Sequence, residues 1–497
     1  MNRIRLNIGF NTDTTTAVVG RYGGTIASTQ LINTFNGTDS LDIITIGDSN
    51  AGNSSVGSYG YTVALQKALK NNYKIPVYAT PLLGNGSFYV GQTTGLSQAD
   101  NMCSWGVGMH SPFNGQTDNG QVYNLVKAAT ANYTDAVELK TNLNFNSTNY
   151  TVSDSTTMLP KPNGFQWGGE YVRGDETYTS GASENYIIVD SKAPFNNTND
   201  ISYASGPSSS YRLVCGVFSG VSGFTAGQFK LRIRGSDGTN IAISPNYIST
   251  FYPLAAITPY KTATLDFNAP VFSTSVTNYR ASWDGQNSGN PATGPFASLW
   301  SSIIKLNQKG CSVSNLIYHG GLTTTQIADR VEGMNLLLEC YLKEILERQK
   351  TAGGTGNALI FINSGINQDT TTANYTSSCD RIIAAITTKW IFVGGQTNKL
   401  SFVFSLTHPT TSTGNSSTWA TNRSSYLTAA TAWINFQTQN VNFIDIEALI
   451  PSWELLKNKY YATNSTNEAH LSLSTSTETS TSGYDVVTGL MLNALLR

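Results

Sequence analysis

Short apolar runs alternate with amphipathic stretches over two parts of the chain. Apolar and β-branched residues stand side by side at 41–46 (LDIITI), 312–321, 357–365, 400–408 and 441–450, which predicts strands buried on both faces. Helical spacing of apolar residues predicts helices at residues 59–73, 298–310, 326–350, 378–390, 423–437 and 483–497. Alternation of such strands with helices predicts the α/β fold class, with a parallel sheet covered on each side.

The chain between about residues 91 and 295 has a different pattern. Short alternating runs at residues 210–220, 228–238 and 260–272 are cut by Gly, Pro, Asn or Asp roughly every ten residues. This is typical of antiparallel strands packed as a sandwich or barrel. The simplest architecture is an α/β domain interrupted by a β-rich insertion. It has an N-terminal extension (1–40), a first α/β segment (41–95), the insertion (96–296) and a second α/β segment (297–497).

Composition narrows the setting in which the chain works. Of its residues 39% are hydrophobic, enough for packed cores, but only 12% are charged, about half the usual share. The net charge is -1, so no basic excess attracts nucleic acid or anionic lipid. No apolar run approaches a membrane span, and the N-terminus lacks the apolar stretch of a secretory signal. A chain rich in Gly, Ser, Thr and Asn suits contact with carbohydrate and an extracellular or virion setting.

The candidate chemistry begins where the first predicted strand ends, at the sequence GDSN of residues 47–50. Reactive groups of a parallel α/β sheet lie at the carboxyl ends of its strands. Ser49 stands at such an end, on the turn toward the next helix, where a free backbone N–H can stabilise an oxyanion. Ser49 is therefore a candidate nucleophile. The alternative interpretation is a helix N-cap in which Asp48 and Ser49 satisfy free N–H groups.

Partners for Ser49 are expected after the other strands. Gly321 follows the second strand, and a glycine lets the backbone approach a ligand closely. Asn367 follows the third strand and offers a side-chain amide donor. His470 lies just before the last helix and is the candidate base, with His408 at the end of the fourth strand as the fallback.

Four sequence blocks, taken in order and after successive strands, resemble the SGNH (GDSL-like) hydrolase family: Gly47-Asp48-Ser49-Asn50, Gly321-Leu322-Thr323-Thr324, Gly365-Ile366-Asn367 and His470-Leu471-Ser472. The similarity covers the two α/β segments, about half of the chain. It implies a three-layer, flavodoxin-like hydrolase domain interrupted by a β-rich, sandwich-like insertion. It also implies esterase chemistry that needs no metal and no organic cofactor.

The resemblance implies a role for each block. Ser49 would attack an ester carbonyl, and His470 would take its proton and later pass it to the leaving alcohol. The oxyanion hole would consist of the backbone N–H of Ser49, the backbone N–H of Gly321 and the side chain of Asn367. Asn467 stands three residues before His470, where the family usually has an aspartate.

The chain departs from the family pattern in the first and third blocks. The first block reads GDSN rather than GDSL, and the third places Asp369 one residue further along than usual. The second block also has a competitor, because Gly84 and Gly86 follow a plausible strand. Gly321 is preferred because its loop runs directly into a long helix, as the oxyanion-hole loop of this family does.

Asn467 is the departure with the largest chemical consequence. An amide can orient an imidazole, but it cannot stabilise the imidazolium as a carboxylate does. Three interpretations therefore stay open: a Ser-His dyad oriented by Asn467, support of His470 by Glu468 instead, or a slow or inactive enzyme.

The expected function is a serine esterase that removes O-acetyl or other short acyl groups from a polysaccharide or surface glycan, as a component of a phage virion or tail. The β-rich insertion would be a carbohydrate-binding platform. Other partners would be virion proteins or further copies of the chain. The main alternative is a catalytically weak or inactive scaffold with a structural or glycan-binding role. A lipid esterase is disfavoured by the low hydrophobicity around the motifs.

Overall fold

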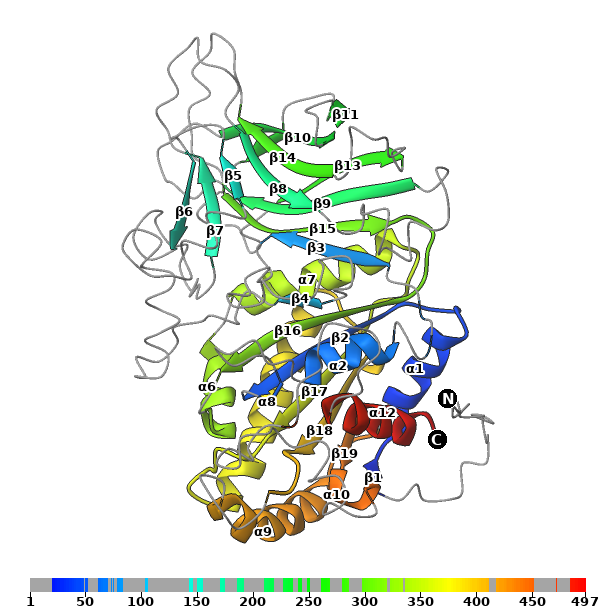
Figure 1. Cartoon of the computed structure of the whole chain (residues 1–497), viewed down its shortest axis with the longest axis vertical. Helices are drawn as coiled ribbons and strands as arrows, with labels where there is room; N and C mark the ends of the chain where they lie inside the picture. Colours follow the sequence, from blue (N-terminus) through cyan, green and yellow to red (C-terminus); the bar gives the residue numbers. More distant parts are fainter. Residues whose placement is uncertain are drawn as a thin grey trace.

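The structure of the protein is a computed structural model, which describes residues 20–48, 50–51, 61–69, 73, 75, 78–83, 103–105, 143–145, 150–154, 170–174, 186–191, 210–218, 227–235, 240–243, 248–250, 261–268, 279–285, 297–319, 322–333, 336–410, 417–450, 471 and 483–497. These residues form a seven-stranded, mostly parallel sheet and two six-stranded antiparallel sheets (Figure 1). Helices lie around the seven-stranded sheet.

The seven-stranded sheet has the order β1-β19-β18-β17-β2-β16-β4. Its strands are β1 (Arg21–Gly23), β19 (Val441–Ile444), β18 (Leu400–Leu406), β17 (Asn357–Ser364), β2 (Leu41–Asp48), β16 (Cys311–His319) and β4 (Cys103–Trp105). Neighbours pair in parallel except β1, which runs antiparallel to β19. The chain places β16 on one side of β2 and then β17, β18 and β19 on the other. The strand order therefore reverses at β2, as in doubly wound α/β sheets.

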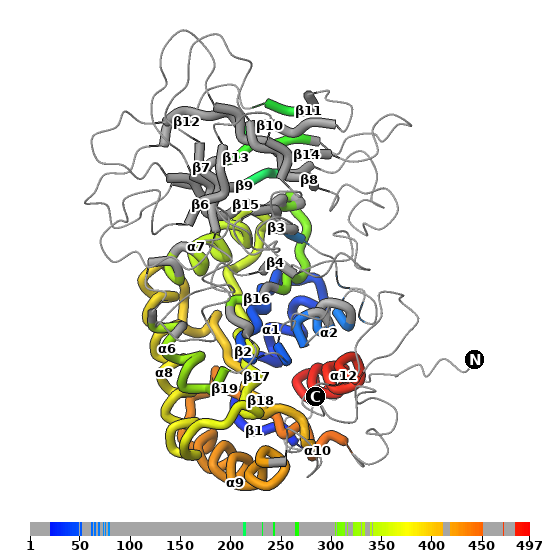
Figure 2. The backbone as a smooth tube through the Cα atoms, turned by 60° about the vertical axis from the view of Figure 1, so that its left-hand side comes forward, coloured from blue at the N-terminus to red at the C-terminus, as the bar shows by residue number. Residues whose placement is uncertain are grey.

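Helices cover both faces of this sheet (Figure 2). One face carries α6 (Thr324–Gly333), α7 (Leu336–Thr351), α8 (Thr372–Phe392) and α9 (Ser417–Ile434). The other carries α1 (Ile26–Phe35), α2 (Tyr61–Lys67) and α12 (Gly483–Leu496), with the short α10 (Ile446–Leu449) packed against α12. A 3-10 turn, η5 (Thr397–Lys399), precedes β18. The predicted α/β class, with a mostly parallel sheet between helices, is confirmed.

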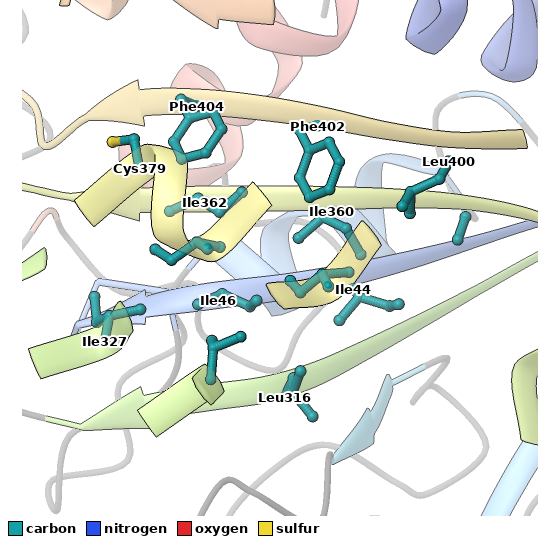
Figure 3. Packing of buried hydrophobic residues seen from close by; sticks show 14 of the residues in the cluster. Ile44, Ile46, Leu316, Ile327, Ile360, Ile362, Cys379, Leu400, Phe402 and Phe404 are labelled. Atoms are coloured by element: carbon teal, nitrogen blue, oxygen red, sulfur yellow. The ribbon is translucent and has the colours of Figure 1, made fainter. Parts of the chain in front are cut away.

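The central strands are apolar on both faces because both faces are covered. Every residue of β2, β17 and β18 is buried. On the α8 face, side chains of these strands form one cluster with the helix (Figure 3), namely Ile44, Ile46, Ile360, Ile362, Phe402, Phe404, Cys379, Ile382, Ile386 and Trp390. Full burial of one such aliphatic or aromatic side chain contributes about 1.5–3 kcal/mol.

A buried ionic network lies at the amino end of β2. Asp42 accepts hydrogen bonds from Arg348, from Gln349 and from the Tyr78 hydroxyl. Arg348 also pairs with Glu344, at 3.0 Å between Nη1 and Oε1. The side chains of Asp42, Arg348 and Glu344 have no exposed surface. The network fastens α7 to the end of β2 that lies away from the predicted site.

Two antiparallel sheets are built from strands between residues 79 and 305, in the orders β11-β10-β14-β8-β5, with β12 on β10, and β13-β9-β15-β7-β6, with β3 on β15. The strands are β3 (Ala79–Leu83), β5 (Leu143–Phe145), β6 (Tyr150–Asp154), β7 (Glu170–Gly174), β8 (Tyr186–Ser191), β9 (Ser210–Phe218), β10 (Gly227–Gly235), β11 (Asn240–Ile243), β12 (Ile248–Thr250), β13 (Lys261–Asn268), β14 (Tyr279–Gly285) and β15 (Ala297–Lys305). Antiparallel strands are thus present in the region predicted to be β-rich. Their packing as a sandwich-like insertion domain stays a prediction.

Two helix predictions are wrong. Residues 298–310, predicted as a helix, begin with β15, which pairs antiparallel with β9. The β-branched and aromatic residues of that stretch suit a strand. Residues 326–350, predicted as one helix, are divided between α6, which ends at Gly333, and α7, which begins at Leu336. Glycine is a poor helix former, so a helix end there is physically reasonable.

The predicted N-terminal extension, residues 1–40, contains two elements that belong to the sheet and its cover. Strand β1 pairs with β19, and α1 packs against α12 and β18. Arg21 of β1 donates hydrogen bonds to the carbonyls of Ala494 and Leu495 at the end of α12. This part of the chain therefore completes the α/β layer arrangement.

Candidate functional site

The predicted site residues belong to segments that follow β2, β16 and β17 and precede α12. Asn367 is described by the structure. The other predicted site residues lie outside the described residues: Ser49, Gly321, Asn467, Glu468 and His470. The competing glycines, Gly84 and Gly86, lie outside them as well. The sequence neighbours of three of the blocks are described, and their contacts show how these segments approach one another.

Strand β2 ends in a tight turn that Asp48 and Asn50 hold together. Oδ1 of Asp48 accepts hydrogen bonds from the backbone N–H of Asn50, at 2.8 Å, and from its side-chain amide, at 3.2 Å. The backbone N–H of Ala51 donates to the carbonyl of Asp48 at 3.0 Å. The N–H of Tyr61, the first residue of α2, donates to the carbonyl of Asn50 at 2.8 Å. The turn around position 49 is therefore fixed to both β2 and α2.

Asp48 is an acidic group in an unfavourable place for a charge. Its side chain has no exposed surface. Burial raises the pKa of Asp48 to about 6, and the two hydrogen bonds from Asn50 act in the opposite direction. Oδ2 of Asp48 has no hydrogen-bond partner among the residues that the structure describes. An ionised carboxylate here at neutral pH therefore costs free energy that the fold has to supply.

Tyr484, in the first turn of α12, connects this turn with the segment before the helix. Its hydroxyl donates a hydrogen bond to Oδ1 of Asn50 at 2.7 Å and accepts one from the backbone N–H of Leu471. Tyr484 is 1% exposed and Leu471 is 2% exposed. Burial raises the pKa of the Tyr484 hydroxyl, so it keeps the proton that it donates. One buried oxygen atom thus joins position 50 and position 471.

The segment after β16 enters α6 through a capping box. Oγ1 of Thr323 accepts a hydrogen bond from the backbone N–H of Gln326 at 3.2 Å, and the Gln326 side chain accepts one from the N–H of Thr323 at 2.9 Å. Leu322, just before, has no exposed surface. The sequence Thr323-Thr324-Thr325-Gln326 therefore sets where α6 begins, directly after the Gly321 loop.

The start of α6 is bound to the segment after β17. The Thr324 hydroxyl donates to Oγ of Ser364 at 3.1 Å, and the backbone N–H of Thr325 donates to Oδ1 of Asp369 at 2.8 Å. The backbone carbonyl of Asp369 in turn accepts a hydrogen bond from the Tyr426 hydroxyl of α9 at 2.6 Å. Asp369 therefore satisfies a free N–H group of α6 and joins the second and third blocks.

The third block requires its glycine and leaves an amide available. Gly365 has φ 121°, and a Cβ there would lie 2.8 Å from the Trp419 ring, so a side chain would fit neither the backbone conformation nor the space. Asn367, two residues on, is partly buried. Its Nδ2 atom is buried and has no hydrogen-bond partner within the described part of the chain. A buried amide donor of this kind suits an oxyanion hole.

His408, the fallback base, follows β18. It has no exposed surface, and its backbone carbonyl accepts a hydrogen bond from the indole N–H of Trp419 at 3.1 Å. A general base has to reach a proton on the nucleophile or the substrate, directly or through one water. A side chain enclosed in this way is poorly placed for that role. The hydrogen bond from Trp419 to the His408 backbone carbonyl connects the end of β18 to α9.

These contacts gather around the point where the strand order reverses. Gly47 pairs with Asn363 of β17, and Asp48 pairs with His319 of β16, so the last residues of the three strands lie beside one another. Ligands of doubly wound sheets bind at the carboxyl ends of the strands at such a point. Within the residues described, no group of three or more His, Cys, Asp or Glu side chains is placed to hold a metal ion.

Sequence reasoning missed the bridging role of Tyr484 and the capping role of Asp369. Tyr484 and Asn50 are 434 residues apart, and a lone tyrosine at the start of an apolar helix has no local signal beyond its aromatic character. Asp369 was visible as a displaced acid after Asn367, and that displacement places it at the start of α6.

None of the helices described is long and apolar enough to cross a membrane.

Comparisons with known proteins do not assign a family. No family model and no curated protein matches the sequence. Solved structures that resemble parts of the fold include the CBM22-1 xylan-binding domain of Paenibacillus barcinonensis Xyn10C, at 8% identity over 33% of this chain and 85% of that chain with a TM-score of 0.21. A cyclase from Fischerella sp. TAU is 12% identical over 36% of this chain and 93% of that chain, with a TM-score of 0.22. A family two carbohydrate esterase from Clostridium thermocellum, in complex with cellohexaose, is 9% identical over 55% of this chain and 84% of that chain, with a TM-score of 0.19. At such TM-scores these likenesses carry no argument about this chain.

Proposed function

We propose that the protein is a serine esterase of the SGNH type. Ser49 is the nucleophile and His470 the general base. The oxyanion hole consists of the backbone N–H groups of Ser49 and Gly321 and the side-chain amide of Asn367. This proposal assigns the seven-stranded sheet and its helices to a flavodoxin-like hydrolase domain and the two antiparallel sheets, which include β3 and β15, to a sandwich-like insertion.

The observation that carries the proposal is the shared hydroxyl of Tyr484. Leu471 directly follows His470, and Asn50 directly follows Ser49. The Tyr484 hydroxyl donates to Oδ1 of Asn50 at 2.7 Å and also accepts a hydrogen bond from the backbone N–H of Leu471. Asn50 and Leu471, the sequence neighbours of Ser49 and His470, therefore contact the same side chain, and this supports the proposal that the nucleophile and the base belong to one site. Such proximity between segments so far apart in sequence is what a Ser-His pair requires.

The contacts of α6 support the proposed oxyanion hole. The second and third blocks are joined by two hydrogen bonds, from Thr324 to Ser364 and from Thr325 to Asp369. The third block also directly follows β17, which pairs with β2, the strand that ends just before position 49. Asn367 has a buried amide nitrogen that no described residue engages. Donors prepositioned in this way stabilise the charge that develops in acyl transfer.

The reaction proceeds in two steps through an acyl-enzyme. Oγ of Ser49 forms a bond to the ester carbonyl carbon as His470 takes the hydroxyl proton, and the carbonyl oxygen becomes an oxyanion. The C–O bond to the alcohol breaks, and the alcohol leaves with the proton from His470. A water molecule, deprotonated by His470, then attacks the acyl carbon. The bond between the acyl carbon and Oγ of Ser49 breaks, His470 returns the proton to Oγ, and the carboxylic acid leaves.

The proposed substrate is a polysaccharide or surface glycan that carries O-acetyl or other short acyl groups. The support is compositional, since the chain has few charged residues and many Gly, Ser, Thr and Asn residues. The antiparallel sheets would be the binding platform for the glycan. A phage virion or tail, or another extracellular setting, is the proposed location.

The proposal is tested by release of acetate from an O-acetylated polysaccharide and of p-nitrophenol from p-nitrophenyl acetate. Ser49→Ala is expected to abolish both activities. Ser312→Ala is the matched control, because this buried serine lies at the amino end of β16 and its Oγ has no partner among the described residues. Equal rates for native protein and Ser49→Ala would remove Ser49 from the mechanism.

A second candidate function is favoured by Asn467. If the amide at this position fails to support His470, the protein is a scaffold with a structural or glycan-binding role. Two results together would support this candidate. The native protein would bind an acetylated polysaccharide without releasing acetate, and the Asn467→Asp variant would gain esterase activity. Substitution of a triad aspartate by asparagine lowers turnover about 10⁴-fold in the well-studied serine protease example, which sets the scale of the expected gain.

A further inference from the structure

Tyr484, Asn50 and Asp48 form a continuous buried chain of hydrogen bonds. The chain runs from the backbone N–H of Leu471 to the Tyr484 hydroxyl, from there to Oδ1 of Asn50, and from the Asn50 amide to Oδ1 of Asp48. Asn50 and Asp48 have no exposed surface, and Tyr484 is 1% exposed. Water therefore does not compete for these bonds, and a partner lost from the chain leaves a buried polar group unpaired.

This chain of hydrogen bonds accounts for the departure of the first block from the GDSL pattern. A leucine at position 50 has no polar atom to offer. Asn50 uses its side-chain oxygen to accept from Tyr484 and its side-chain nitrogen to donate to Asp48. Both halves of the amide are thus engaged, in one orientation only. Position 50 is where the segment next to the proposed base is fastened to the turn that carries the proposed nucleophile.

Ring packing fixes the position of the Tyr484 hydroxyl. Tyr61 of α2 meets the Tyr484 ring edge to face, with centroids 5.1 Å apart and an interplanar angle of 87°. Tyr61 also packs against Phe361 of β17, with centroids 6.5 Å apart. The edge-to-face contact between Tyr61 and Tyr484 restrains the Tyr484 ring beyond what its buried area alone provides. The hydroxyl is therefore held by α2, α12 and β17 together, and it can act as a fixed point for position 471.

We propose that Tyr484 is a positioning residue for the esterase reaction, because its hydroxyl sets the register between the segment of His470 and the turn of Ser49. The proposal rests on the proposed function. Tyr484 does not touch the substrate in this scheme. Its hydroxyl holds the N–H of Leu471 beside Asn50, and this contact orients the segment that carries the proposed base relative to the turn that carries the proposed nucleophile.

Removal of the hydroxyl is expected to affect turnover far more than substrate binding. Tyr484→Phe leaves the ring packing intact but frees the backbone at position 471 to shift. A misplacement of about 1 Å between reacting groups can cost about 10²-fold in rate. We therefore expect a fall in kcat of about 10- to 100-fold, with KM within about twofold of the native value.

Tyr78→Phe is the matched control. The Tyr78 hydroxyl is also buried and donates to a buried carboxylate on β2, but at Asp42, the amino end of the strand. Each variant therefore removes one tyrosine hydroxyl. The Tyr78 hydroxyl contacts the amino end of β2, and the Tyr484 hydroxyl contacts the turn after its carboxyl end. Loss of the Tyr78 hydroxyl is expected to lower the thermal midpoint and to leave kcat within about twofold of native, measured well below the midpoint.

Asn50→Leu provides a second variant that does not depend on the folding of Tyr484→Phe. It removes the acceptor of the Tyr484 hydroxyl and restores the GDSL sequence. Asn50→Leu also removes the hydrogen bond from the Asn50 amide to Asp48, so we expect a loss in kcat at least as large as that of Tyr484→Phe. The double variant should lose no more than Asn50→Leu alone, because both changes break the link between Tyr484 and Asn50.

The experiment measures kcat and KM for p-nitrophenyl acetate, and the thermal midpoint, for native protein, Ser49→Ala and these variants. Losses in kcat for Tyr484→Phe and Asn50→Leu that do not multiply in the double variant support the inference. If the native protein is active and Ser49→Ala is inactive, a kcat of Tyr484→Phe equal to that of Tyr78→Phe would overturn the positioning role of Tyr484. The esterase proposal would then still stand. Multiplying losses in the double variant would overturn the positioning role too. Equal rates for native protein and Ser49→Ala would instead refute the esterase proposal itself.

Discussion

Asp48→Asn is predicted to change stability in a pH-dependent way that follows from burial of the carboxylate. The pKa of Asp48 is about 6 in the fold and 3.8 in its ordinary state. The native state therefore binds more protons than the unfolded state between these values, so the native protein loses stability as pH rises from about 4 to about 6 and stays level above. Asparagine keeps an oxygen that can accept from Asn50 but carries no charge. The variant should escape this loss.

The magnitude follows from the difference between the two pKa values, about 2.2, at 1.36 kcal/mol for each pH unit, which is about 3 kcal/mol in full. Between about pH 4 and about pH 8, the free energy of unfolding of Asp48→Asn should therefore rise relative to native by about 2–3 kcal/mol. The assay is urea unfolding followed by the helical far-UV signal, to which the helices that cover the seven-stranded sheet contribute.

Asp39→Asn serves as the control for this assay. Burial acts to raise the pKa of Asp39, but hydrogen bonds from Thr355, Ser40 and Asn357 together lower it. Because the pKa of Asp39 is lowered in the fold, its linkage to stability is confined to pH values up to about one unit above the ordinary value of 3.8, so the difference between Asp39→Asn and native should be flat above about pH 5. A pH-independent difference for Asp48→Asn as well would refute the reasoning, because it would mean that the Asp48 carboxylate is not penalised by burial.

Three further predictions concern other parts of the structure. Arg348→Met should lower the free energy of unfolding by about 3–5 kcal/mol, measured by urea unfolding, because it leaves the buried carboxylates of Asp42 and Glu344 without their cation. Gly47→Ala should destabilise the fold strongly in the same assay, since a Cβ there would lie 2.3 Å from a carbonyl oxygen of β17; a midpoint like native would contradict that close approach. Asn367→Ala should lower kcat for p-nitrophenyl acetate about 10²–10³-fold with little change in thermal midpoint, and an unchanged kcat would exclude Asn367 from the oxyanion hole.

The sequence predicted the α/β sheet because its central strands have local signals. Strands β17 and β18 are continuous apolar runs whose every residue is buried, so the pattern itself reports their environment. Helices α8 and α12 were recognised for a similar reason, from apolar residues at helical spacing. The order of the strands follows from how such units connect, and it agrees with a doubly wound sheet.

Elements that depend on distant partners were not predictable in the same way. Strand β15 has apolar residues whose spacing also fits a helix, and only its pairing with β9, far back in the chain, makes it a strand. Strand β1 is three residues long and gains its place from β19. The site shows the same limit. The four blocks could be read from the sequence, but the Tyr484 bridge between position 50 and position 471 is a tertiary contact without a local signature.

The most direct measurement of whether Ser49 and His470 form one active site is covalent labelling with a fluorophosphonate, located by mass spectrometry of the resulting peptides. The native protein should be labelled on Ser49, and His470→Ala should suppress that labelling while the protein remains folded. Native folded protein that stays unlabelled at Ser49, or labelling that does not depend on His470, would contradict the account.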